Sequence, residues 1–325
     1  MTLPDLELMN RLKGHPVLEE RHCEDIVSDI VPFFDALDPL PDDCPLLAFT
    51  FYVQAGNSQS VIRNLSWGAV DPRSEPWATT LTAFAEAFAL SNPLATLILV
   101  TDTKTPLPEI PGRHRIVRAE FDNNRLMFER QRAFSALLQS RLFAKPVVFL
   151  DSDVVVIRDL AMVFEQDFDV GLTYRAATNT LYALMPANEG VIFANSANPA
   201  SAIGFFQAVL NHYRALAEHS DVLKWYPGGI WCWRGGQLSL NSVGVGWKLI
   251  RDDAETRFAD REGARVAFLP CHRYNRTLRG LDGNGLQELK ESYAIHFKGD
   301  RKSAIPEAVA QLKEQSLSFN KKVPA

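Results

Sequence analysis

The chain has little cysteine, no long hydrophobic run and no excess of positive charge. Its four cysteines lie far apart with no C-x-x-C pair, at Cys23, Cys44, Cys232 and Cys271. This spacing argues against a disulfide framework or a zinc site and indicates reduced thiols. No uncharged apolar run approaches the ~18 residues that span a bilayer, and the first residues lack a signal peptide's basic start and apolar core. We therefore expect a soluble, cytoplasmic protein, with peripheral membrane association left open.

Two further absences narrow the functional classes. The net charge of −5 and the sequence pI near 5.8 argue against a nucleic-acid partner. The sequence contains neither G-x-G-x-x-G nor G-x-x-x-x-G-K-[ST], so it offers no support for a dinucleotide-binding or P-loop site. The balance of 46% hydrophobic and 22% charged residues is that of an ordinary globular protein.

What the sequence does contain is a pair of aspartates inside its most apolar stretch. Asp151 and Asp153 follow the run 147–150 and precede the Val-rich run 154–157. Such runs predict a buried strand, where an unpaired carboxylate costs several kcal/mol. On an extended backbone, residues two apart leave the same face, so the two carboxylates can hold one hard divalent cation. The pattern predicts a metal site, in preference to a strand end with two exposed turn aspartates.

Strand and helix signals alternate along the chain. The expected strands are 46–53, 95–102, 115–118, the strand of the two aspartates, 168–174, 190–194 and 265–269, and the expected helices are 76–90, 126–142, 200–218 and 305–315. This order predicts an α/β fold with a mainly parallel sheet, which binds ligands at the carboxyl ends of its strands. We expect an N-terminal helical extension at 1–44, one domain at 45–302 and a C-terminal helical tail at 303–325.

Five short motifs follow one another in a fixed order. They are F-L-D-S-D-V-V at 149–155, N-E-G at 188–190, G-Q at 236–237, L-P-C-H-R-Y-N at 269–275 and H-F-K-G-D-R-K at 296–302. Together they resemble the motifs of GT-A class nucleotide-sugar glycosyltransferases, most like the retaining family 8 type, over roughly residues 46 to 302. The resemblance implies a GT-A (Rossmann-like) mixed, mainly parallel sheet flanked by helices. One position departs from the family, because Gly236 stands where its members usually have Asp, which leaves the donor sugar open.

The resemblance also implies a metal site and a donor. Asp151, Asp153 and His296 would hold Mn²⁺ or Mg²⁺, and two carboxylates with one imidazole suit Mn²⁺. The metal would neutralise the diphosphate of a UDP-sugar and act as a Lewis acid on the leaving group. Lys302 would reach the same diphosphate, and the backbone of Gly299 would approach it closely.

Other donor contacts follow from the resemblance with less support from spacing. Arg132, on the helix before the aspartates, would contact the donor. Arg130 or Arg141 could take this part instead, and Arg132 also fits a solvent-exposed helix face with no function. Thr50 to Tyr52, in the last part of the first expected strand, would flank the nucleobase.

The catalytic assignments also come from the resemblance. Asn188 and Gln237 would face the reacting sugar, although Asn188 also fits an ordinary turn before a strand. Aromatic side chains precede Gln237, and they either contact the acceptor or pack in the core beneath a Gly-rich loop. These aromatic residues are Trp225, Tyr226, Trp231 and Trp233.

The sequence therefore predicts a metal-dependent glycosyltransferase that moves a hexose from a UDP-sugar, with retention of configuration. The acceptor would be a glycan, a lipid-linked glycan, a protein or a small molecule. One alternative is a haloacid-dehalogenase-type phosphatase, with Asp151 as nucleophile and Asp153 as acid/base. In such enzymes the nucleophilic strand usually opens the domain, whereas here other strands precede it. The other alternative is a non-catalytic sugar-nucleotide-binding relative.

Overall fold

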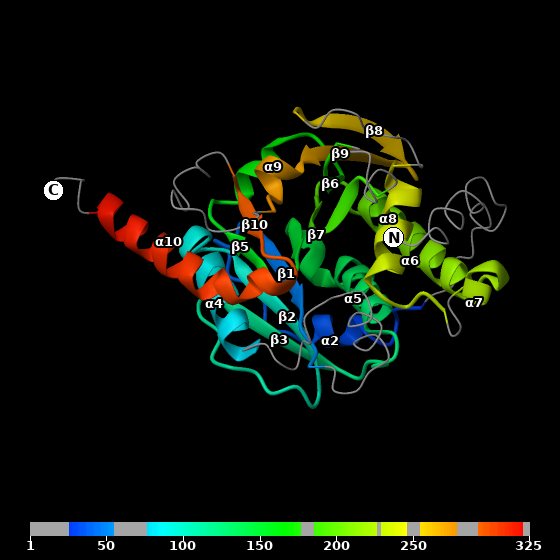
Figure 1. Ribbon diagram of the computed structural model, residues 1–325, viewed down its shortest axis with the longest axis horizontal. Helices are drawn as coiled ribbons and strands as arrows, with labels where there is room; N and C mark the ends of the chain where they lie inside the picture. The colour runs from blue at the N-terminus through cyan, green and yellow to red at the C-terminus, as the bar shows by residue number, and fades with distance from the viewer. Residues whose placement is uncertain are drawn as a thin grey trace.

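A computed structural model of the chain describes residues 26–54, 77–176, 185–225, 229–245, 254–277 and 292–320. Its centre is an eight-stranded sheet in the order β3-β2-β1-β4-β7-β6-β9-β8, with a separate pair formed by β10 and β5 (Figure 1). In that order the strands of the large sheet are β3 (His114–Ala119), β2 (Thr96–Asp102), β1 (Leu47–Phe51), β4 (Val147–Leu150), β7 (Ala187–Ala194), β6 (Val170–Tyr174), β9 (Ala264–Pro270) and β8 (Arg257–Arg261).

The sheet is mixed and mainly parallel, as the sequence predicts. Strands β3, β2, β1 and β4 run parallel to one another, and β6 runs parallel to β9. The pairs β4–β7, β6–β7 and β8–β9 are antiparallel. All seven residues of β2 are buried, which fits a central strand that is covered on both faces.

Helices cover both faces of this sheet. The principal ones are α4 (Trp77–Ser91), α5 (Leu126–Gln139), α6 (Pro199–Glu218), α8 (Trp233–Val245) and α10 (Ile305–Asn320). Alternate residues of a strand point to opposite faces. Phe49 and Phe149 accordingly pack with α5 and α6 on one face, whereas Ala48 and Val148 pack with α4 on the other. Helix α10 lies against α4, on the outside of this second layer (Figure 1).

The segment before the sheet packs onto α5. Helix α2 (Val31–Asp35) follows a turn, and the buried side chains of Val27, Ile30 and Phe34 join the same core cluster as α5. Residues 1–25 of the expected extension lie outside the described part of the chain. The division into 1–44, 45–302 and 303–325 stays a prediction. Within the described ranges, no helix is long and apolar enough to span a membrane.

The greatest difference from the sequence prediction lies at the two aspartates. Strand β4 ends at Leu150, and β5 (Val154–Val156) belongs to the small pair with β10 (Ala294–His296), not to the main sheet. Between β4 and β5 the chain turns, and the Val154 N–H donates to the Asp151 carbonyl at 3.1 Å. The expectation of an extended backbone through both aspartates is therefore wrong. A turn is needed because the chain changes sheets at this point.

The second half also holds elements that sequence patterns did not indicate. Helix α8 begins in a Trp-Arg-Gly-Gly segment, and glycine is a poor helix former. Strand β8 has mostly exposed or half-exposed residues, so it lacks the apolar signal of a strand. The shorter helices α7 (Ser220–Trp225) and α9 (Cys271–Tyr274) complete this half.

Candidate metal and donor site

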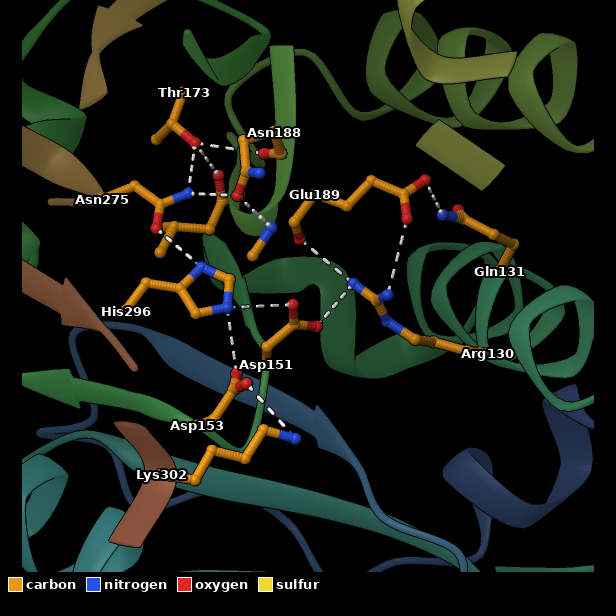
Figure 2. Close-up of polar contacts among 12 residues, drawn as sticks. Arg130, Gln131, Asp151, Asp153, Thr173, Asn188, Glu189, Asn275, His296 and Lys302 are labelled. Atoms are coloured by element: carbon orange, nitrogen blue, oxygen red, sulfur yellow. Dashed lines mark hydrogen bonds and ion pairs between the residues drawn. The ribbon is translucent and has the colours of Figure 1, made fainter. Parts of the chain in front are cut away.

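Strand pairing brings three potential metal ligands together from distant parts of the chain. His296 ends β10, pairs with Val154 at the start of β5, and thereby lies beside the turn that carries Asp151 and Asp153. The Phe297 N–H donates to the Asp153 carbonyl at 2.9 Å, which ties the two segments together. One ligand atom from each of the three side chains lies within 4.8 Å of the other two. His296 Nε2 is 3.0 Å from Asp153 Oδ1 and 3.7 Å from Asp151 Oδ2 (Figure 2).

A chain of hydrogen bonds fixes how the His296 ring is protonated. Its starting point is the Gly190 backbone N–H, which can only donate and lies 3.1 Å from Asn188 Oδ1. This contact identifies that Asn188 atom as the acceptor oxygen. Asn275 Nδ2 is 2.7 Å from the same oxygen and 2.8 Å from Thr173 Oγ1, so it must be the donor in both contacts. The amide of Asn275 is thus fixed with its oxygen on the other side.

That oxygen faces the imidazole. Asn275 Oδ1 lies 3.1 Å from His296 Nδ1, and because an amide oxygen only accepts, Nδ1 carries the ring proton (Figure 2). In the neutral ring, Nε2 then holds a lone pair directed at the two carboxylates. A lone pair this close to carboxylate oxygens is repulsive unless a cation lies between them. The cation is either a second proton on the ring or a metal ion.

The donor set fits a divalent metal. Asp153 Oδ1 is buried, and within the described ranges of the chain it has no hydrogen-bond partner besides the contact with His296 Nε2 at 3.0 Å. Burial opposes ionisation of Asp153. In the metal-free protein, the positive charge of a protonated His296, together with Lys302 and Lys298, nevertheless holds the pKa of this carboxyl below its ordinary value. Two carboxylate oxygens and a neutral imidazole nitrogen are ligands that Mn²⁺ accepts. The residue that orients the ring, Asn275, plays the part that supporting hydrogen bonds commonly play around metal-binding histidines.

Basic side chains hold the aspartate oxygens that face away from His296. An Arg130 guanidinium nitrogen lies 2.9 Å from Asp151 Oδ1, leaving Oδ2 on the His296 side. Lys302 Nζ lies 3.6 Å from Asp153 Oδ2, leaving Oδ1 on the His296 side. Each aspartate therefore presents one oxygen to the centre of the site and one to a cation. Asp151 is the more exposed of the two aspartates, with 28% of its side chain accessible to solvent.

Arg130 also connects the site to a second, buried carboxylate. Its guanidinium donates to the Glu189 carbonyl at 3.0 Å and lies 3.5 Å from Glu189 Oε2. Gln131 Nε2 donates to Glu189 Oε1 at 3.0 Å. Burial raises the pKa of Glu189 to about 7; Arg130 opposes the rise, and the negative charge of Asp151 adds to it.

Gly190 leaves room for the imidazole. A Cβ atom at this position would lie 2.2 Å from Cε1 and 2.3 Å from Nδ1 of His296. The N-x-G motif therefore has a local physical reason. Its Asn orients Asn275, and its Gly allows the ring to lie against the strand.

Of the three arginines expected near the donor, one lies beside the metal ligands and two bind other parts of the chain. Arg132 does not reach the aspartates, because its guanidinium binds the Ile26 carbonyl, Asp29 and Glu129. Arg141 donates to the Leu37 carbonyl. The arginine beside the metal ligands is Arg130, which had been only an alternative.

The other predicted site residues lie in a turn beside the metal ligands or are buried in helices and strands. Gly299 opens the 3₁₀ turn (Gly299–Ala304) that carries Lys302. Asn188 is buried and contacts Gly190 and Asn275. Gln237 is buried on α8, and its Nε2 has no partner in the described part of the chain. Thr50 is fully buried within β1.

The aromatic candidates are only partly described. Trp231 is 6% exposed and packs edge-on against Phe128, with the Arg125 guanidinium 4.4 Å from its ring centre. Trp231 therefore packs in the core, which is one of the two roles expected for these aromatic side chains. Tyr226 lies outside the described residues. The backbone of Trp225 and Trp233 is described, but their side chains are not.

Glu189, Gln131 and Asn275 are the residues that sequence reasoning did not assign. Two of them stand inside quoted motifs, Glu189 as the middle residue of N-x-G and Asn275 as the last residue of the L-P-x-x-x-Y-N segment. A polar residue within an apolar strand was the one available signal for Glu189, since β7 is buried throughout.

Comparisons with known proteins return similar structures only. No protein-family model and no curated protein matches the chain. Two crystal structures of the glycosyltransferase GlyE in Streptococcus pneumoniae TIGR4 share 14% and, for the apo form, 16% identity, each with a TM-score of 0.46. Each alignment covers 87% of this chain. It covers 66% of the chain in the first GlyE structure and 65% of the chain in the apo structure. The bifunctional glycosyltransferase WbbM, in an apo structure, shares 14% identity at a TM-score of 0.46, with 86% of this chain and 53% of its own aligned. The chain thus spans less than two thirds of each, and likeness at this level does not establish a function.

Gly190→Ala tests the packing of the imidazole. The added methyl group must displace the His296 ring, so we expect a loss of about 1–3 kcal/mol of stability and at least about ten-fold weaker Mn²⁺ binding. Gly204→Ala is the matched control, because nothing lies within 4 Å of a Cβ at this position in α6. That variant should gain up to about 1 kcal/mol and bind Mn²⁺ like the wild type. Calorimetric titration and urea unfolding measure both effects, and equal metal affinity in the two variants would contradict this role of Gly190.

Glu189→Gln tests the burial of the second carboxylate. Because the pKa of Glu189 is raised from 4.5 to about 7 on folding, the folded state binds the proton more tightly than the unfolded state. The wild type therefore loses stability as pH rises from about 4.5 to about 7. Glu189→Gln lacks this titration, so its stability relative to wild type should be about 1–3 kcal/mol more favourable at pH 8 than at pH 5. Urea unfolding in EDTA measures this, and the same difference at both pH values would be the contrary result.

Proposed function

We propose that this protein is a metal-dependent glycosyltransferase that moves a hexose from a UDP-sugar, with Mn²⁺ (or Mg²⁺) as its metal. The observation that carries the proposal is the cation site formed by His296 Nε2 and the carboxylates of Asp151 and Asp153. The family resemblance of the motifs supplies UDP, the hexose and retention of configuration.

The proposed site combines metal ligands with positive charge. Asp151, Asp153 and His296 would hold the metal, which supplies Lewis-acid stabilisation of the departing diphosphate. Lys302 and Arg130 already lie against the outer oxygens of the aspartates, where they can also bind phosphate oxygens. Gly299 begins the turn that carries Lys302 and would let the backbone approach the diphosphate.

On the sugar side, we retain Gln237 as a residue that faces the donor sugar. Its buried Nε2 has no hydrogen-bond partner among the residues that the structure describes, so a ligand oxygen could satisfy it. Asn188 is better supported as a positioning residue, since its Oδ1 already orients Asn275. Arg132 is not part of the proposed site, because Asp29 and Glu129 occupy its guanidinium.

The phosphatase alternative has less support from the site. A nucleophilic Asp151 would need a free oxygen directed at the substrate, but one oxygen is held by Arg130 and the other lies on the His296 side. That reading also gives His296 no part in the chemistry.

Thermal stability in the presence of donor and metal tests the proposal. The diphosphate and the metal complete each other's site, so we expect UDP with Mn²⁺ to raise the melting temperature well beyond either alone. The measurement is a thermal-shift screen of UDP, GDP and ADP with and without Mn²⁺. The absence of a shift with every nucleoside diphosphate plus metal would refute the proposal. Turnover of p-nitrophenyl phosphate that Asp151→Asn abolishes would favour the phosphatase.

A further inference from the structure

We propose that Glu189 is a specificity-determining residue, whose carboxylate accepts hydrogen bonds from hydroxyl groups of the donor hexose, and that position 236 has no side chain so that this carboxylate fits. The inference rests on the proposed function, and it assigns recognition of the sugar to a carboxylate on β7.

The position of Glu189 relative to the metal ligands is the first support. Arg130 lies between Asp151 and Glu189, at 2.9 Å from a carboxylate oxygen of the former and 3.5 Å from one of the latter (Figure 2). The Glu189 carboxylate is therefore one side chain away from the metal site, and on a different side of the aspartates from Lys302 (Figure 2). A sugar attached to a diphosphate at the metal would have to lie within a short reach of the aspartates.

The second support is the incomplete hydrogen bonding of this carboxylate. A carboxylate has about four lone-pair positions for hydrogen bonds. Within the described residues, Glu189 Oε1 accepts one hydrogen bond from Gln131, and Oε2 has an ion-pair contact with Arg130 at 3.5 Å. Within the described residues 5% of the side chain is exposed, and a ligand hydroxyl would reach the carboxylate through this opening. A polyhydroxylated ligand offers O–H donors to these oxygens, and when the carboxylate is ionised such hydrogen bonds belong to a strong class.

The third support is the absence of a side chain at Gly236. A Cβ atom there would lie 2.8 Å from Glu189 Oε1 and 3.2 Å from Oε2. Glycine inside a helix such as α8 costs about 1 kcal/mol relative to alanine. The space that this glycine leaves is next to the Glu189 carboxylate, so the two positions fit each other.

A second buried glutamate gives a comparison within the same protein. Glu129 is about as buried as Glu189, but its Oε2 accepts a hydrogen bond from Arg132 at 2.7 Å. That pair joins α5 to the segment at Asp29 and does not contact the metal ligands. Glu129 therefore serves as the control for the loss of a buried carboxylate paired with arginine.

The first experiment compares binding of UDP with binding of UDP-glucose, UDP-galactose and UDP-N-acetylglucosamine, all with Mn²⁺, by calorimetry at pH 8. Glu189, with its pKa of about 7, is ionised at this pH. In Glu189→Gln we expect the sugar nucleotide preferred by the wild type to bind about ten- to a hundred-fold more weakly, because a hydrogen bond to a charged group is lost. UDP itself should change by less than about two-fold. Glu129→Gln should leave both affinities unchanged.

The second experiment moves the carboxylate from position 189 to position 236. Glu189→Ala should weaken binding of the UDP-sugar, and adding Gly236→Asp to that variant should restore it at least in part. Restoration is expected because the new carboxylate enters the space that Glu189 vacated. Gly236→Asp alone should weaken sugar binding, because its side chain displaces and repels Glu189. Circular dichroism checks that each variant is folded.

The outcomes separate this inference from the proposed function. If Glu189→Gln weakens UDP and the UDP-sugar equally, Glu189 only supports Arg130, and the inference is wrong while the proposed function stands. Failure of the double variant to regain any binding of the UDP-sugar would also count against it. If the wild type binds none of these nucleotides with Mn²⁺, both the proposed function and the role of Glu189 are wrong.

Discussion

The contact on which the site depends is the one between His296 and the carboxylates of Asp151 and Asp153. The backbone N–H of Gly190 orients Asn188, Asn188 orients Asn275, and Asn275 holds the proton of the ring on Nδ1. The Nε2 lone pair therefore faces two negative side chains, and this arrangement is stable only around a cation.

The fold provides what this contact requires. Strand β4 ends in the main sheet, the chain turns through the two aspartates, and β5 starts a separate pair with β10. Because that pair ends with His296, the imidazole is placed by backbone hydrogen bonds and not by a flexible loop. The β4–β7 pairing brings the N-x-G segment to the same place, since the Asp151 N–H donates to the Gly190 carbonyl at 3.0 Å. The metal ligands and the residues that orient them thus share one backbone framework.

The sequence predicted the parts of this arrangement that depend on strand order and on motif spacing. The mixed sheet is confirmed, and Asp151, Asp153, His296 and Lys302 lie together. Arg132 was chosen over Arg130, although residues two apart on a helix point in nearly opposite directions, and its neighbours could not be read from the chain. Likewise, only the folded protein shows that Glu189 on β7 fills the space beside Gly236 on α8.

Binding of Mn²⁺ followed by electron paramagnetic resonance tests the central claim most directly. The wild type should bind one Mn²⁺ with electron spin-echo modulation from an imidazole nitrogen. His296→Ala should lose this modulation and bind the metal at least about ten-fold more weakly. His212→Ala removes a different buried histidine, on α6, and should retain both properties. A His296→Ala protein that binds Mn²⁺ as tightly as the wild type, with the nitrogen signal intact, would contradict the account.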